Sequence, residues 1–168
     1  MTLVAFTVDE ANALNASHRF NCGPAALCAV TGLRPIEALA VITHFAERGY
    51  TNPKMMAAAL TAIGASWRRT WECSDAIKPE HPQFPEFGLV RVQWDGPWCK
   101  PGVPAVARYF HSHWIAVDDA RIFDINCLCV GGWVPWLEWD TQVVPWLLKD
   151  TKASGNWWPT KCWDVARP

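Results

Sequence analysis

The segment FNCGPAALCAV, residues 20–30, places Cys22 directly before Gly-Pro and a run of small apolar residues. Because Pro24 suits the first turn of a helix, we expect Cys22 at or beside the N-terminus of that helix. Unpaired backbone N–H groups and the helix dipole stabilise a thiolate there. A thiolate attacks carbonyl carbons in covalent catalysis, so Cys22 is a candidate nucleophile. The alternative is a cysteine that only fills a helix start.

A thiolate nucleophile needs a base and a group that orients the base. The segment HSHWIAVDDARIFDIN, residues 111–126, predicts a β-hairpin that can supply both. A two-residue turn at 118–119 places His113 opposite Asp124, whereas a turn one residue later places His113 opposite Asn126 with Asp124 diagonal to it. Either register lets a side-chain oxygen accept a hydrogen bond from the imidazole. Asp124 is therefore the candidate orienting residue, and Asn126 is the alternative.

The other histidines suggest less chemistry. A lone histidine in a strand is usually structural or exposed, which is the alternative to a catalytic role for His113. His111 and His113 could share a metal ion, but no third ligand follows at a convincing spacing. We therefore expect no metal and no other cofactor. His18 is close to Cys22 in sequence, and His18 and Trp114 are candidates for lining the cleft.

The positions of proline and glycine indicate the helices and strands that must position these residues. Proline opens and glycine closes three predicted helices, at 24–31, 35–48 and 53–63. From residue 66 onward the sequence pattern predicts short strands, at 66–71, 88–94, 105–110, 113–118 and 121–126. Helices followed by strands predict an α+β fold in which the N-terminal helical part, including the helix of Cys22, packs on an antiparallel sheet.

The length of 168 residues predicts a single domain with a core at 1–126 and a tryptophan-rich C-terminal extension at 127–168 packed on it. More than half of the twelve tryptophans lie between Trp133 and Trp163. These rings either extend the core or form an exposed aromatic surface for a protein or glycan partner.

The composition limits the partners and the cellular location that we expect for the protein. The formal net charge is -1 and only 18% of residues are charged, so no nucleic-acid partner is expected. The N-terminus has no basic region typical of a signal peptide, and no apolar stretch reaches the roughly 18 residues of a spanning helix. We expect a cytoplasmic protein on synthesis, without a membrane partner. Seven cysteines without paired spacing predict reduced thiols rather than a disulfide framework.

The motifs NCGPAALCAVTG and HWIAVDDARIFDIN, separated by two predicted helices, resemble those of the papain-like cysteine peptidases. The similarity is greatest to the bacteriocin-leader-processing (double-glycine) peptidases and their stand-alone relatives, and it covers roughly residues 12–126. The resemblance implies a papain-like core at 1–126 that hydrolyses a peptide or isopeptide bond through a thioester. It makes Cys22 the nucleophile, His113 the general base and acid, and Asp124 the orienting residue, with a peptide or protein as the substrate.

One departure from this family concerns the oxyanion donor. The family has a glutamine six residues before the cysteine, where this chain has Ala16. Asn15 and Asn21 are the candidate replacements, together with the backbone N–H of Cys22. Since one missing donor costs about 10²–10³ in rate, an alternative is a catalytically weak or inactive scaffold that binds within a larger assembly, such as a phage particle. Further alternatives are a cell-wall amidase or endopeptidase and a transglutaminase-like acyltransferase.

Overall fold

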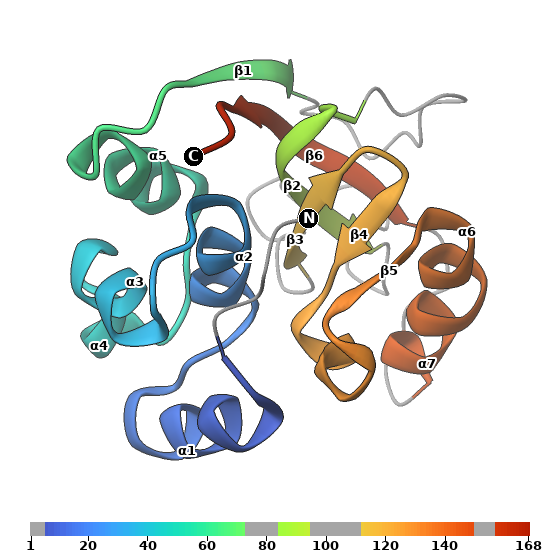
Figure 1. Cartoon of the computed structure of the whole chain (residues 1–168), viewed down its shortest axis with the longest axis horizontal. Helices are drawn as coiled ribbons and strands as arrows, with labels where there is room; N and C mark the ends of the chain where they lie inside the picture. Colours follow the sequence, from blue (N-terminus) through green and yellow to red (C-terminus); the bar gives the residue numbers. More distant parts are fainter. Residues whose placement is uncertain (1–5, 73–83, 95–111, 150–156) are drawn as a thin grey trace, which may run out of the picture.

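A layer of helices covers one face of a mixed-length antiparallel sheet, which makes the fold α+β (Figure 1). The computed structural model describes residues 6–72, 84–94, 112–149 and 157–168. The predicted strand at 105–110 and His111 lie outside these described residues. The α+β class and the antiparallel sheet expected from the sequence are confirmed.

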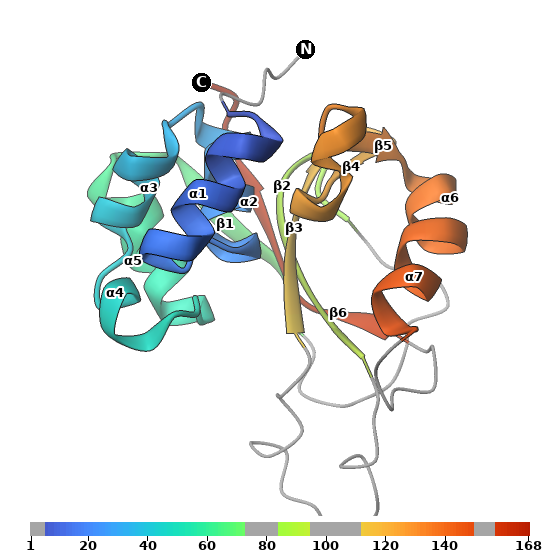
Figure 2. The same cartoon turned by 90° about the horizontal axis from the view of Figure 1, so that it is seen from below.

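The helices on the first face come from the N-terminal part of the chain, as Figures 1 and 2 show. They are α1 (Val8–His18), α2 (Cys22–Thr31), α3 (Pro35–Val41), α4 (Phe45–Arg48) and α5 (Pro53–Ala62). Nearly every residue of α2 is buried, because this helix packs on the sheet with the other helices around it. The helix that carries Cys22 is therefore the most completely buried of the layer.

Two features of this helical layer differ from the sequence prediction. The predicted helix at 35–48 is broken after Val41, where His44 adopts a left-handed conformation (φ 61°) and the chain restarts as α4. The break lets Ile42 and Phe45 both point into the core. Helix α1 was not predicted, although Thr7 and Glu10 form a capping box that marks its start.

Six strands form the sheet in the order β1-β6-β2-β3-β4-β5. Their bounds are β1 (Trp67–Glu72), β2 (Phe87–Trp94), β3 (Ser112–Asp118), β4 (Arg121–Phe123), β5 (Trp133–Pro135) and β6 (Trp157–Val165). Both faces of β2 are buried, since helices lie on each side of the sheet (Figure 2). The strands that were predicted at 66–71, 88–94 and 113–118 match β1, β2 and β3 within one residue.

The C-terminal segment is part of this sheet. Strand β6 lies between β1 and β2, so the chain returns to the centre of the sheet after residue 156. Before it, α6 (Trp136–Glu138), a π-helical turn at Trp139–Val143 and α7 (Val144–Leu148) cover the second face. The described part of the segment 127–168 therefore contributes a central strand of the sheet and the helices on its second face.

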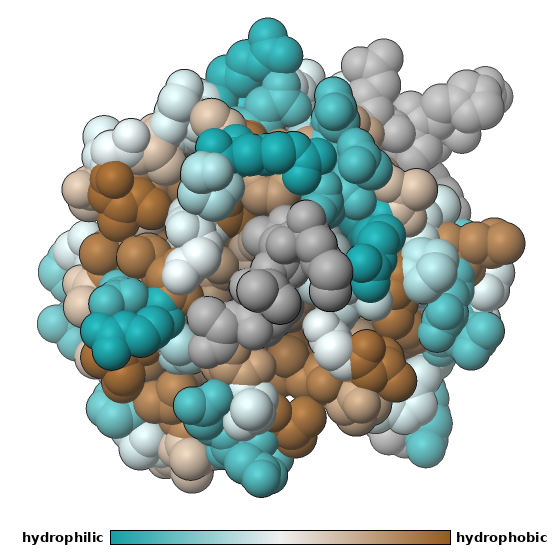
Figure 3. All heavy atoms as spheres, viewed as in Figure 1, coloured by the Kyte–Doolittle hydropathy of each residue, from teal (hydrophilic) through white to brown (hydrophobic). Residues whose placement is uncertain are grey.

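Two hydrophobic clusters fill the two sides of the sheet. The first joins the N-terminal helices to the sheet, and the second joins the sheet to α6 and α7. Most tryptophan rings of the C-terminal segment are buried, namely Trp133, Trp139, Trp157, Trp158 and Trp163, and all of these except Trp158 belong to the two clusters. Trp136 is half-buried against the second cluster, and Trp146 has 58% of its surface exposed. The face in Figure 3 shows hydrophobic residues as separate patches among hydrophilic ones.

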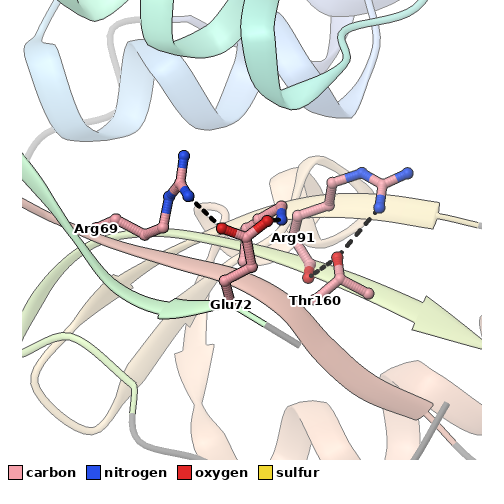
Figure 4. A network of polar contacts seen from close by, with 5 residues as sticks. Arg69, Glu72, Arg91 and Thr160 are labelled. Atoms are coloured by element: carbon pink, nitrogen blue, oxygen red, sulfur yellow. Dashed lines mark hydrogen bonds and ion pairs between the residues drawn. The ribbon is translucent and has the colours of Figure 1, made fainter. Parts of the chain in front are cut away.

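Polar side chains tie the first three strands of the sheet together (Figure 4). Glu72 of β1 forms ion pairs with Arg69 and with Lys161 of β6. Arg91 of β2 is buried and donates to the Thr160 hydroxyl at 3.1 Å, and that hydroxyl donates in turn to the Arg91 carbonyl at 3.0 Å. These contacts cross the positions where β6 is inserted, so they secure its register against both neighbours.

Gly88→Ala is expected to destabilise the protein by about 2–3 kcal/mol, since a Cβ at this position of β2 would lie 2.0 Å from the Trp163 carbonyl oxygen of β6. The obstructing atom is backbone, so relief requires the strands to separate. Urea unfolding measures the effect. Gly32→Ala is the control: its Cβ meets no atom within 4 Å, so only its positive φ is penalised, by about 1 kcal/mol. Equal losses in the two variants would contradict the steric explanation.

Among the described residues, no single helix has the length and apolar character needed to cross a bilayer. Only α2 and α3 taken together reach them, and these two helices are bent by 109° relative to each other.

Candidate active site

Cys22 is the first residue of α2, as the Cys-Gly-Pro pattern predicts. Asn21 caps this helix: its side-chain oxygen accepts from the Gly23 N–H at 3.2 Å, and its amide donates to the Gly49 carbonyl at 2.8 Å. The Cys22 thiol is half-buried at the N-terminal end of α2. The free N–H groups of a first helical turn favour negative charge at this place.

The hairpin of β3 and β4 brings His113 to the same place. The strands pair Asp118 with Arg121 and Ala116 with Phe123, so the turn falls at residues 119–120. This is the later of the two registers considered for the sequence. Strand β4 ends at Phe123, and Asp124 then caps a 3₁₀ turn at Ile125–Val130. His113 therefore meets Asp124 diagonally, and Asn126 is turned away into the 3₁₀ segment.

Hydrogen bonds connect Cys22, His113 and Asp124 in sequence. The Nε2 of His113 lies 2.9 Å from Oδ2 of Asp124. The imidazole also makes a hydrogen bond with the Cys22 thiol, and since Nε2 is engaged with Asp124, Nδ1 is the nitrogen left for the sulfur. The backbone N–H of Trp114 donates to the same sulfur. The ring of Trp94 lies 5.8 Å from the imidazole and covers it.

Asp124 is completely buried, and its carboxylate is fully hydrogen-bonded. Besides His113, Oδ2 accepts from the indole N–H of Trp139 at 2.8 Å. Oδ1 accepts from both the backbone N–H and the side-chain amide of Asn126, at 2.9 and 2.8 Å. Four donors around one anion hold the carboxylate in a single orientation. Asn126 thus supports Asp124 rather than taking its place beside the imidazole.

The electrostatics favour a thiolate–imidazolium pair. Burial alone raises the pKa of the Cys22 thiol, but the charge of His113 and hydrogen bonds from His113 and Trp114 outweigh it and lower the pKa. Burial likewise opposes the His113 cation, yet Asp124 and Cys22 raise its pKa well above the ordinary value. For Asp124, the His113 charge and the hydrogen bonds overcome burial and lower the pKa to about 2.

The remaining described cysteines lack these features. Burial raises the pKa of Cys28, Cys127 and Cys162 to about 12, so these thiols stay protonated. Cys129 is exposed. All five described cysteines are free thiols, and among those with a shifted pKa only Cys22 interacts with a histidine.

A cleft of about 470 Å³ opens beside the Cys22 thiol and the imidazole, between α1 and the 3₁₀ turn. Its walls combine apolar and amide side chains, and no Lys, Arg, Asp or Glu is among the described residues that line it, which are Val8, Ala11, Asn12, Asn15, Phe20, Asn21, Cys22, His113, Ile125, Asn126, Leu128 and Cys129. This size suits a short peptide segment. Uncharged walls favour uncharged substrate groups, because a buried unpaired charge is costly.

The other site residues expected from the sequence fall in different places. Asn15 lines the cleft, and its amide donates to the Phe20 carbonyl at 2.8 Å. Asn21 touches the cleft, but its amide is occupied by the helix cap and by Gly49. His18 is exposed at the end of α1, bonded to Ser17, and does not line the cleft.

The Trp114 side chain does not lie where the sequence suggested, in the wall of the cleft. Its side chain is 3% exposed and belongs to the core on the opposite side of β3 from His113, with its indole bonded to the Thr51 carbonyl. Neighbouring strand residues point to opposite faces, which explains the difference. Only its backbone N–H takes part in the site.

Trp139 is the site residue that the sequence did not indicate. It lies fifteen positions beyond Asp124, in a segment whose irregular turns carry no periodic signal. The many tryptophans around Trp139 suggested either core packing or a binding surface. Nothing in the sequence distinguished the Trp139 ring from the others.

No group of three or more His, Cys, Asp or Glu side chains among the described residues is placed to hold a metal ion. Comparisons of the chain with protein-family models, curated proteins and solved structures found no match. The chemistry must therefore be argued from the site itself.

Proposed function

We propose that this protein is a cysteine hydrolase of peptide or isopeptide bonds, with a papain-like arrangement of its helices and sheet. The observation that carries the proposal is the continuous hydrogen-bonded series from Cys22 through His113 to Asp124, with the thiol at a helix N-terminus and beside a cleft. Nucleophile, base and orienting group each have a partner of the right kind.

In this mechanism the Cys22 thiolate attacks the carbonyl carbon of the scissile bond. The resulting tetrahedral intermediate collapses when the His113 imidazolium gives its proton to the leaving amine, which leaves a thioester on Cys22. Water, deprotonated by His113, then attacks the thioester and releases the acid and the free thiol. Throughout these steps Asp124 keeps the imidazole oriented and stabilises its cationic form.

Two groups are candidates for binding the oxyanion. The backbone N–H of Cys22 is in the first helical turn, where no intrahelical acceptor exists. Asn15 lines the same cleft, and its bond to Phe20 engages one of its two amide N–H groups and orients the other. We therefore infer that Asn15 replaces the glutamine that the papain-like peptidases carry one position later in the chain.

Asn15→Leu is expected to lower kcat by about 10²-fold, since it removes a donor to the developing oxyanion. Alkylation of Cys22 by iodoacetamide forms no oxyanion and should change by less than about 2-fold. Comparing the two rates separates oxyanion binding from thiolate formation. Asn15→Gln, which keeps an amide, should retain more activity than Asn15→Leu. A parallel loss in both reactions would instead indicate damage to the helix start.

The function is tested by incubating the purified protein with a diverse peptide mixture and identifying new termini by mass spectrometry. The matched control is Cys22→Ala. Cleavage that depends on Cys22, with a covalent adduct of a thiol-directed peptide electrophile on this residue alone, is the expected result. An added amine that becomes linked to the peptides would indicate an acyltransferase.

Absence of cleavage, with Cys22 no more reactive than the exposed Cys129, would overturn the proposal. Retention of peptide binding in that case would favour a scaffold that uses the cleft for recognition only.

A further inference from the structure

Trp139 connects the C-terminal segment to the candidate triad. Its side chain is completely buried, and its indole N–H donates to Oδ2 of Asp124 at 2.8 Å. The same oxygen accepts from His113. An indole in the second half of the chain thus shares one carboxylate oxygen with the imidazole.

We propose that Trp139 is a positioning residue that holds the Asp124 carboxylate in the plane required by His113 and offsets part of its negative charge. Its kinetic consequences rest on the proposed function, whereas its effect on the titration of His113 does not. Asn126 holds the oxygen Oδ1, and the indole is the donor that holds Oδ2 independently of the imidazole.

The ring of Trp139 is itself held on several sides. Trp136 stacks on it with ring centroids 5.6 Å apart, and Trp157 of β6 meets it edge-on at 5.4 Å. The indole of Trp157 donates to Asp140 at 2.7 Å, which secures the next residue of the turn. These contacts leave the Trp139 ring little freedom to rotate.

The backbone conformation at Trp139 is a second, independent indication. The π-helical turn begins at this residue and interrupts an otherwise α-helical run from Trp136 to Leu148. A π turn inserts an extra residue into the helix and re-aims the side chains around it, and such turns are frequent at functional sites. A regular helix would rotate the following residues relative to Trp139.

The charge effect has a definite sign. Among the described residues, the titratable groups that act on the Cys22 thiol are His113 and Asp124, and Asp124 raises the pKa of the thiol. The buried Cys127 thiol near Asp124 stays neutral, since burial raises its pKa to about 12. Without the indole N–H, the carboxylate acts more strongly on both Cys22 and His113. Both ionisations of the pair then move to higher pH.

The experiment compares Trp139→Phe with the matched control Trp157→Phe in the full-length protein. Both variants keep an aromatic ring in the same cluster, but the control loses an N–H bonded to Asp140 instead of Asp124. The measurements are the pH dependence of Cys22 alkylation by iodoacetamide and the titration of the His113 ring nitrogens by NMR. Urea unfolding shows that each variant is folded.

For Trp139→Phe we expect both titrations to shift upward by about 0.5–1 pH unit, and Cys22 alkylation at pH 6 to slow by about 3- to 10-fold. For Trp157→Phe neither titration should move. A folded Trp139→Phe protein with wild-type titrations, or equal shifts in both variants, would overturn the proposal. If the wild-type protein cleaves no peptide yet the NMR shift appears, the proposed function fails while the role of Trp139 stands.

Discussion

His113→Ala is expected to slow the alkylation of Cys22 at pH 6 by about 10²-fold. In the wild-type protein the His113 charge and its hydrogen bond are the main causes that lower the pKa of the thiol against burial. Without them, the thiol returns at least to the ordinary pKa of about 8.5, at which only about one molecule in 300 is ionised at pH 6. Hydrolysis should fall by at least about 10³-fold, because the general base is lost as well.

The measurement is the second-order rate constant with iodoacetamide between pH 4 and 10, with adducts mapped by mass spectrometry. The wild-type rate should already be high at acidic pH, whereas the variant should show a single rise at alkaline pH. His18→Ala is the matched control, since His18 is exposed and outside the cleft. A His113→Ala profile that coincides with that of the wild type would refute the thiolate–imidazolium pair.

Asp124→Asn is expected to destabilise the folded protein by about 3 kcal/mol and to lower hydrolysis by about 10⁴-fold. Four N–H groups converge on the two oxygens of the buried carboxylate. An asparagine offers one oxygen, so its NH₂ group must face donors in either orientation. The imidazole also loses the charge that raises its pKa.

Urea unfolding and peptide hydrolysis measure these two losses. Asp140→Asn is the control, because Oδ1 of Asp140 accepts a hydrogen bond from the Trp157 indole, and an asparagine oxygen can replace that acceptor. The control should change stability by less than about 1 kcal/mol. If Asp124→Asn were as stable as Asp140→Asn, the carboxylate would not be the centre of the network.

The pH dependence of stability reports the same group. The pKa of Asp124 is about 2 in the folded protein, against an ordinary value of 3.8 for an aspartate, so ionisation stabilises the fold by about 2 kcal/mol above pH 4. Since the folded pKa is the lower one, this contribution is lost as the pH falls from about 4 to 2. Unfolding free energies measured across this window should fall steeply for the wild type and less steeply for Asp124→Asn.

Local sequence features predicted the parts of the site that depend on local structure. The Cys-Gly-Pro motif indicated that Cys22 begins a helix, because proline and glycine constrain the backbone within a few residues. Alternation along the hairpin limited the partners of His113 to Asp124 and Asn126. The choice between them depended on a one-residue difference in the turn and on the 3₁₀ segment after β4, which short-range preferences do not determine.

Long-range packing determined the features that the sequence pattern could not predict. A strand with no partner in the adjacent sequence has no preferred place in a sheet, so the insertion of β6 between β1 and β2 could not be inferred from residues 157–165. The different positions of Trp114 and Trp139 could not be inferred from the sequence either, because the two side chains are chemically identical.

One of these two indoles lies in the core against Thr51, and the other bonds to Asp124. The sequence by itself determined the α+β class, the helix start at Cys22 and the approach of His113 to Asp124 or Asn126 across the hairpin turn, since each depends on contacts between near neighbours. The tertiary structure alone decided that Asn15 faces the cleft, that His18 does not and that Trp139 reaches Asp124, because the free energies that place them come from surfaces distant in the chain.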